Sequence, residues 1–109
     1  MSGIGIRKCD GGGVLVELRG EFDRHNLEDL RETLSDAVAL RRTTLVDLSK
    51  VTFLDMGATR ELAVRSQLYA HHLTLCNPSW QVKASVAACG FGAWGDFRTG
   101  VDGSHPQAP

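Results

Sequence analysis

The hydrophobic and polar positions along the chain change their period several times, and each change marks an expected element. Residues 4–8 alternate apolar and polar side chains, and residues 14–18 form a short apolar run after three glycines. A period of two is typical of strands, and glycine-rich segments are typical of turns. The pattern predicts two strands that form a hairpin through residues 9–13, the second of which is broken by residues 20–23.

A helical period follows this hairpin. Asn26 suits the N-cap, because its side-chain oxygen can accept a backbone N–H of the first turn, and Asp29 falls near the positive end of the helix dipole. The apolar positions then recur at spacings of three and four, as on one face of an amphipathic helix: Leu27, Leu30, Leu34, Ala37 and Val38. The sequence therefore predicts a helix that buries this stripe.

The second half of the chain repeats the order strand, helix, strand, helix. Residues 43–48 form a short run rich in β-branched side chains, as in a central strand. A helix is expected from residues 57–58 to about residue 70. Residues 73–76 predict another short strand. A last helix is expected over residues 79–89, with a serine as its N-cap and a glycine just after its end.

This alternation of elements favours an α/β fold. Helices that alternate with strands pack on a sheet, here a mixed one, and a last short strand is expected near residues 94–98. A length of 109 residues corresponds to one domain, which we expect over residues 1–99. Residues 100–109 are small, polar and proline-rich, and they predict a disordered C-terminal tail.

Composition and charge argue against several classes of partner. The chain has 12 basic and 13 acidic residues without a block of like charge, so neither nucleic acid nor an anionic membrane is an expected partner. No apolar run approaches the roughly 20 residues that span a bilayer, and no secretion signal is visible. The 3 cysteines lack metal-ligand spacing and predict free thiols in a reducing compartment. We therefore expect a cytoplasmic protein without direct membrane insertion.

No group of residues predicts catalysis, a cofactor or a metal. His71 and His72 are adjacent, so they point in different directions, and no third ligand accompanies them. The glycines of residues 11–13 lack the Lys-Ser/Thr of a phosphate loop and precede a strand. Ser49 has no nucleophile elbow around it. We expect a protein that is not an enzyme and needs no cofactor.

The segment from Val46 to Ala58 carries the main resemblance to a known protein family. Its sequence, Val-Asp-Leu-Ser-Lys-Val-Thr-Phe-Leu-Asp-Met-Gly-Ala, is similar to the signature of the STAS family, which includes the anti-sigma factor antagonists. In that signature Asp-Leu-Ser-x-Val-x-Phe-Leu-Asp leads into Ser-Ser-Gly at a helix start, and the second serine is phosphorylated. Three further motifs stand in the family's order: Gly20-Glu21-Phe22-Asp23, Leu30-Arg31-Glu32-Thr33-Leu34, and Asn77-Pro78-Ser79 with Val82.

The resemblance implies both a fold and a function. It implies a STAS-like fold, with a mixed sheet of four to five strands and helices packed mainly on one side. It also implies that the chain binds an anti-sigma factor, a GHKL-type serine kinase that otherwise holds a sigma factor and that releases the antagonist on phosphorylating it. The implied partner-binding residues lie at two acidic turns and one helix start: Asp23, Asp55, Met56, Gly57, Ala58, Thr59 and Arg60.

The chain departs from the family at the phosphoacceptor. Without a gap, Met56 and Gly57 stand where the family has its two serines. Sliding the signature by one residue would match Gly57 to the family glycine but would place Glu61 on an apolar position. Neither alignment leaves a hydroxyl at the acceptor position, and Thr59 is only a weak candidate. The resemblance therefore predicts an antagonist that the usual serine phosphorylation does not switch.

Some alternatives stay open at the level of sequence. Asp23 and Asp55 either contact a partner or only cap local structure. Met56 belongs either to an adaptable binding surface or to a gap in the core. Because STAS-like domains also serve as small subunits of lipid-transport ABC complexes and of sensory assemblies, a non-enzymatic accessory subunit is the alternative function.

Overall fold

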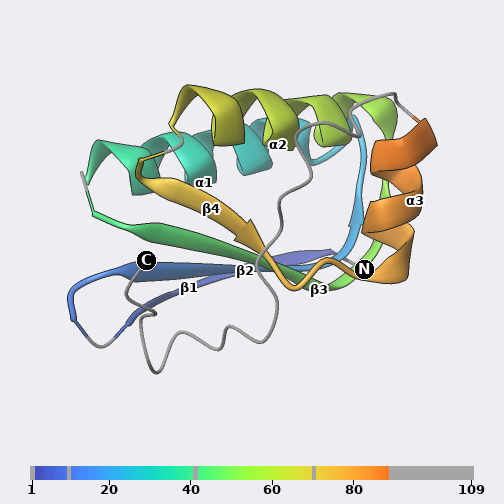
Figure 1. Cartoon of the computed structure of the whole chain (residues 1–109). Coiled ribbons are helices and arrows are strands. Elements are labelled where there is room, and N and C mark those ends of the chain that lie inside the picture. The colour runs from blue at the N-terminus through green and yellow to red at the C-terminus, as the bar shows by residue number, and fades with distance from the viewer. Residues whose placement is uncertain (1, 10, 41, 70, 89–109) are drawn as a thin grey trace.

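The computed structural model describes residues 2–9, 11–40, 42–69 and 71–88 (Figure 1). In these segments the elements are β1 (Gly3–Lys8), β2 (Val14–Phe22), α1 (Leu27–Ala39), β3 (Thr44–Leu54), α2 (Met56–Leu68), β4 (Leu73–Cys76) and α3 (Trp80–Ala88). This order confirms the predicted α/β class. The strand expected near residues 94–98 and the expected C-terminal tail lie outside the described residues.

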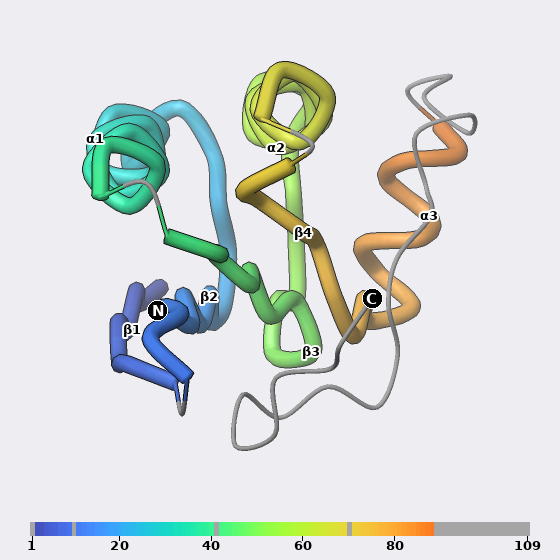
Figure 2. The backbone as a smooth tube through the Cα atoms, turned by 60° about the vertical axis from the view of Figure 1, so that its left-hand side comes forward, coloured from blue at the N-terminus to red at the C-terminus, as the bar shows by residue number. Residues whose placement is uncertain are grey.

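The strands form one mixed sheet in the order β1-β2-β3-β4. β1 is antiparallel to β2, whereas β2, β3 and β4 are parallel to one another. Parallel neighbours need crossover connections, and α1 and α2 provide them. Figure 2 shows these two helices side by side over one face of the sheet, while α3 lies beside β4 and packs against β3. The expected mixed sheet with helices mainly on one side is confirmed.

The core lies between the sheet and the helices α1 and α2. Alternate residues of β2 and of the first part of β3 point to this face, because strand side chains alternate. Beyond Leu48 the buried positions of β3 are spaced by three, at Val51 and Leu54, and the predicted stripe of α1 packs onto this face. The largest side chains fully buried there are Phe22, Leu18, Leu30, Leu34, Leu48 and Leu62. Burying one such side chain contributes roughly 1.5–3 kcal/mol. This packing fixes α2 on the sheet.

The two central strands are longer than the sequence pattern predicts. The prediction that Gly20 breaks the second strand is wrong, as is the prediction that the central strand ends at Leu48: pairing continues to Phe22 in β2 and Leu54 in β3. Gly20 adopts a φ of 82°, which glycine tolerates. Two register shifts absorb the irregular positions, and a local pattern does not reveal pairing through such shifts. The extension carries both strands to the start of α2.

Asn26 stands at the N-cap of α1, but its side chain makes no capping hydrogen bond. Its Oδ1 accepts from the backbone N–H of Asp23 (2.8 Å), and its Nδ2 donates to the Glu21 carbonyl (2.8 Å) and to Ser2 Oγ (2.9 Å). The predicted capping contact is wrong because the amide turns back to the preceding loop. Asp29 still places negative charge in the first turn. The amide of Asn26 thus ties the loop before α1 to the end of β2.

Ser79 joins the start of α3 to β3. Its Oγ donates to the Val51 carbonyl (2.7 Å) and accepts from the backbone N–H of Val82 (3.2 Å), which confirms the predicted N-cap. We expect Ser79→Ala to lower the free energy of unfolding by about 1–2 kcal/mol, because it removes a cap and leaves a carbonyl without its donor. Urea denaturation measures this change. Ser49→Ala, at an exposed position, is the control and should cost less than about 0.5 kcal/mol; equal losses would contradict the role of Ser79.

Candidate functional site

The extended ends of β2 and β3 bring Asp23 and Asp55 to the same end of the sheet. The backbone N–H of Asp55 donates to the Phe22 carbonyl (3.0 Å), so the residue after β3 is fixed to the last residue of β2. Asp55 also N-caps α2, since its Oδ1 accepts from the backbone N–H of Ala58 (2.8 Å). The capping interpretation of Asp55 is therefore confirmed, and a partner contact through the same half-buried carboxylate stays a prediction.

Asp23 shapes the loop before α1. Its Oδ1 accepts from the backbone N–H of His25 (2.8 Å), two residues further on. Asp side chains often stabilise turns in this way. Because Phe22 is bonded to Asp55, this loop lies against the start of α2. The local role of Asp23 is thus clear, and its contact with a partner stays a prediction.

The first turns of α2 separate the predicted binding residues into exposed and buried ones. Met56 is 72% exposed, which agrees with the surface interpretation and excludes the core one. Gly57 and Arg60 are exposed as well. Ala58 and Thr59 are 0% exposed, because they lie on the face of α2 that packs on the sheet. Of these residues, only Met56, Gly57 and Arg60 are therefore accessible to another molecule, and Gly57 offers only its backbone.

The hydroxyl of Thr59 is engaged inside the helix. Its Oγ1 donates to the Asp55 carbonyl (2.8 Å), and its backbone N–H donates to the same oxygen (2.9 Å). A phosphoacceptor hydroxyl has to reach the nucleotide of the kinase, and this one is buried and directed to the helix backbone. The geometry therefore argues against Thr59 as a replacement for the missing serine.

A groove of about 420 Å³ lies between α1 and α2, beside this exposed turn. Its lining residues are Leu27, Arg31, Gly57, Arg60, Glu61 and Val64. Those from α2 follow Gly57 at three, four and seven residues, so they share one helix face. Four of these residues were not predicted from the sequence: Leu27, Arg31, Glu61 and Val64. Glu61 and Val64 could have been identified, because they follow Gly57 at helical spacing.

Charged side chains hold the two helices together at the groove. Glu61 accepts from Arg31 Nε of α1 (3.2 Å) and from Arg65 Nε of α2 (2.8 Å), and Arg65 Nη1 donates to Ser35 Oγ of α1 (2.8 Å). The hydrogen bond to Glu61, followed by the negative charge of Glu61, raises the pKa of Arg31 above its ordinary value. Arg60 forms no ion pair with a described residue. The lining of the groove thus carries a net positive charge.

Gly57 has room for a side chain. A Cβ built on it would lie 3.5 Å from Asp55 Oδ1 and 3.6 Å from Leu27 Cδ2, which are ordinary van der Waals distances. Gly57 lies within α2 and does not have a positive φ. Neither crowding nor backbone conformation therefore requires glycine here, and the fold accepts a serine at this position.

Neither a metal site nor a membrane-spanning helix is found in the described segments. No group of three or more His, Cys, Asp or Glu side chains in them could hold a metal ion. Among their helices, none has the length and apolar character needed to cross a membrane. Cys76 is buried with Leu15 and Leu45 on the sheet face opposite α1 and α2, and Cys9 packs against this cluster. Cys89 lies outside the described residues.

Fold and site together define the class of this chain. It is a small α/β domain in which two crossover helices cover one face of a mixed sheet, and the exposed start of one helix borders a groove. The chain belongs to the STAS domain family, whose family model matches residues 6–103. No match to the chain was found among curated proteins.

Solved structures share this fold. The unphosphorylated form of the anti-sigma factor antagonist SpoIIAA has a TM-score of 0.69 and 23% identity, over 92% of this chain and 90% of that one. An uncharacterized protein of the DUF3478 family with a SpoIIAA-like fold, from Shewanella loihica PV-4, has a TM-score of 0.57 and 14% identity, over 93% and 86%. A structure of Mglu has a TM-score of 0.57 and 19% identity, over 68% of this chain and 19% of that one. At these identities the similarity concerns the fold alone.

Proposed function

We propose that this chain is an anti-sigma factor antagonist, a non-enzymatic cytoplasmic protein that binds an anti-sigma factor and so frees a sigma factor. Family membership and the fold shared with SpoIIAA support this function. The observation that carries it is the exposed Met56, 72% accessible at the capped start of α2. The proposed partner is a GHKL-type serine kinase.

The proposed binding surface consists of Met56, Gly57 and Arg60, with the α1–α2 groove beside them. A flexible thioether adapts to an apolar pocket of a partner, and an apolar anchor within a polar rim is typical of binding hot spots. Asp23 and Asp55 would contribute to this rim. The cap of α2 and the ion pairs of Glu61 hold the surface in place before binding, which lowers the entropic cost of association.

We further propose that serine phosphorylation does not release this antagonist from its partner. Gly57 carries no hydroxyl at the family position, and the Thr59 hydroxyl is 0% exposed. In the family, a phosphate at the helix start acts by like-charge repulsion and by its desolvation cost in the interface. Without that step, the complex is controlled by the abundance of its components or by a competing partner.

A pull-down from native lysate tests the function, with the chain as bait and with ATP or ADP present. We expect mass spectrometry to identify a GHKL-type kinase that is retained equally under both conditions. Recovery of a membrane ATPase or a sensory scaffold without a kinase would contradict the sigma-factor function and favour the accessory-subunit alternative. Phosphorylation and release of the bait in ATP would contradict the proposed loss of the switch.

Met56→Asp is expected to weaken binding to the recovered kinase by about tenfold or more, or about 1.4 kcal/mol, because it places a charge where the apolar anchor docks. Isothermal titration calorimetry measures the dissociation constant. Leu68→Asp is the matched control, since Leu68 is 68% exposed near the other end of the same helix. A loss of affinity in the control as large as that in Met56→Asp would mean that the start of α2 is not the binding surface.

A further inference from the structure

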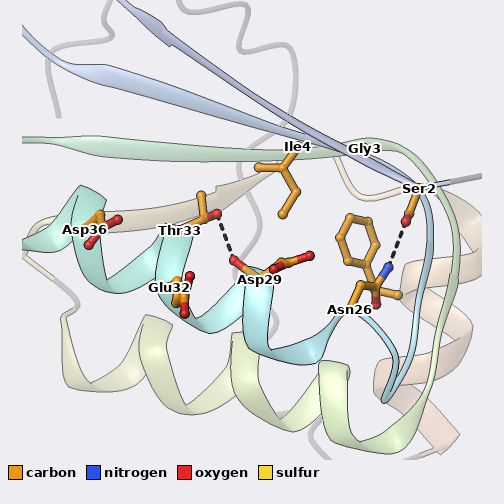
Figure 3. A pocket seen from close by; sticks show the side chains of 9 residues that line it. Ser2, Gly3, Ile4, Asn26, Asp29, Glu32, Thr33 and Asp36 are labelled. Carbon is orange, nitrogen blue, oxygen red and sulfur yellow. Dashed lines mark hydrogen bonds between the residues drawn. The ribbon is translucent and has the colours of Figure 1, made fainter.

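β1 forms one edge of the sheet, and no described strand pairs with its outer side. Such an edge offers backbone N–H and C=O groups to which another strand can add. A cavity of about 400 Å³ lies between this edge and α1, with Ile4 on its sheet side (Figure 3). The edge and the cavity together form a groove that is separate from the start of α2.

The α1 side of this groove is acidic. Asp29, Glu32 and Asp36 line it, and they follow one another at spacings of three and four, on one side of the helix. All three are exposed, and none forms an ion pair with a described residue. Neighbouring like charges repel one another, so a cation placed among them is favoured.

β1 itself carries a matching cation. Ile6 pairs with Val16 of the core, so Ile6 points to the helix side of the sheet, as do Ile4 and Lys8 at the alternate positions. Ile6 is 59% exposed, although it is a large apolar side chain. Lys8 is exposed and forms no ion pair with a described residue. The edge thus presents an apolar side chain and a positive charge on the same face as the acidic groove.

We propose that two copies of this chain associate through β1, antiparallel about a two-fold axis, and thereby join their sheets. With Ile6 opposite Ile6 of the second copy, Lys8 of the second copy stands opposite Ile4. Opposed residues of antiparallel strands point to the same face. The ammonium of that Lys8 then reaches the groove at Asp29 and Glu32, and the symmetry repeats the contact.

The register through Ile6 fits better than its neighbours. Shifting one β1 strand by one residue along the other would place the side chains that match in the proposed register on opposite faces of the joined sheet. If Gly5 stood opposite Gly5 of the second copy, Lys8 would lie opposite a residue before the start of β1. If Arg7 stood opposite Arg7 of the second copy, two positive charges would be neighbours. In the proposed register Arg7 of the second copy stands beside Gly5, whose neighbour on β2 is Glu17. On that outer face Glu17 already pairs with Arg7 (3.5 Å) and Lys50 (3.9 Å) of its own chain, and the Arg19 guanidinium lies over Gly5. The opposite charges that favour association are therefore those on the helix side of the joined sheet.

A lysine on an edge strand usually opposes the pairing of edges. Here the three carboxylates of α1 offset that effect, because they supply the counter-charge that an approaching Lys8 needs. An extended basic segment of another protein is the competing occupant of the same groove. The apolar Ile6 at the centre of the edge and the lysine near its end make β1 complementary to itself, which favours a second copy.

Sedimentation equilibrium of the full chain at low salt, from about 1 μM to about 1 mM, tests the association. A short strand edge buries less than a standard interface, so we expect a dissociation constant on the order of 100 μM. Lys8→Glu should weaken the dimer by about tenfold or more. Adding Glu32→Lys to Lys8→Glu should restore it, because the two charges are exchanged and a merely structural effect would not be rescued.

Lys83→Glu, at an exposed position of α3, is the matched control and should leave the dissociation constant unchanged. Hydrogen exchange locates the interface: the β1 amides should gain protection as concentration rises. A chain that is monomeric over the whole range, including one that binds a basic peptide at this groove, would overturn the proposal. Dimerisation with unchanged β1 exchange, or unaffected by Lys8→Glu, would overturn it too.

Discussion

Gly57→Ser is expected to turn the chain into a substrate of the proposed GHKL-type kinase partner, with phosphorylation approaching one phosphate per chain where none is expected for the parent chain. The ungapped alignment with the STAS signature places this residue at the acceptor position. Gly57 is exposed, and a Cβ there stays 3.5 Å or more from its neighbours. The new hydroxyl would therefore be accessible without any change in the fold.

The surroundings of Gly57 also favour the phosphorylated product. Backbone N–H groups and the positive dipole end of α2 stabilise an anion at the helix start. Arg60 and Arg31 line the same groove and add positive charge, while Asp55 lies close by and opposes it. We expect the phosphorylated variant to dissociate from the kinase, because a dianion placed in an interface is disfavoured by desolvation and by like charges.

Incubation with the kinase and ATP, followed by mass spectrometry, measures this change. Gly57→Ala is the control, because it adds a Cβ without a hydroxyl and should remain unlabelled. Met56→Ser separates the two alignments: labelling of Met56→Ser but not of Gly57→Ser would favour the alignment that is shifted by one residue. Labelling of the parent chain at the same rate as Gly57→Ser would contradict the loss of the acceptor.

Phe22→Ala is expected to lower the free energy of unfolding by about 3–5 kcal/mol, the cost typical of deleting a buried aromatic side chain. Phe22 is 0% exposed at the end of β2, in the core cluster that holds α1 and α2 on the sheet. The total stability of a domain is about 5–15 kcal/mol. The loss is therefore a large fraction of what holds the domain together.

Guanidinium chloride denaturation measures this loss, and Phe53→Ala provides the comparison. Phe53 lies in the same sheet but is 48% exposed, so the same substitution should cost about 1 kcal/mol or less. The hydrogen bond from the Asp55 N–H to the Phe22 carbonyl belongs to the backbone and is kept in Phe22→Ala, so the loss reports on the aromatic side chain alone. Similar losses in the free energy of unfolding for Phe22→Ala and Phe53→Ala would mean that the buried Phe22 side chain does not stabilise the core more than the exposed Phe53.

The fold is predictable from the sequence where one periodic pattern governs a whole element. The stripe of α1 and the short run of β4 are of this kind, because their burial follows from local spacing alone. The ends of β2 and β3 are not predictable in this way. Ser49 and Lys50 are exposed and polar, yet they lie within β3, since the pairing of Gly20 and Phe22 continues past them.

The candidate site also contains features that local sequence predicts and features that depend on tertiary packing. The cap by Asp55 involves residues that are close in sequence, whereas the exposure of Met56, which the sequence leaves open, is known only from the structure. The burial of Thr59 also has a local signal, since Leu62 and Ala63 follow it at helical spacing. Leu27 and Arg31 have none, because only the packing of α1 against α2 brings them to Gly57. The hydrogen bonds of the Asn26 side chain were not predictable either, because several backbone groups lie within its reach and the sequence does not show which of them it contacts.

The capped and clamped start of α2 has a consequence for the kinetics of partner exchange. A surface that needs no rearrangement docks as a rigid body, with an association rate constant of about 10⁵–10⁷ M⁻¹s⁻¹ that varies little among related partners. Differences between partners then appear in the lifetime of each complex. Under the proposed function, in which no phosphoryl transfer ends that lifetime, spontaneous dissociation would set how long a sigma factor remains free to direct transcription.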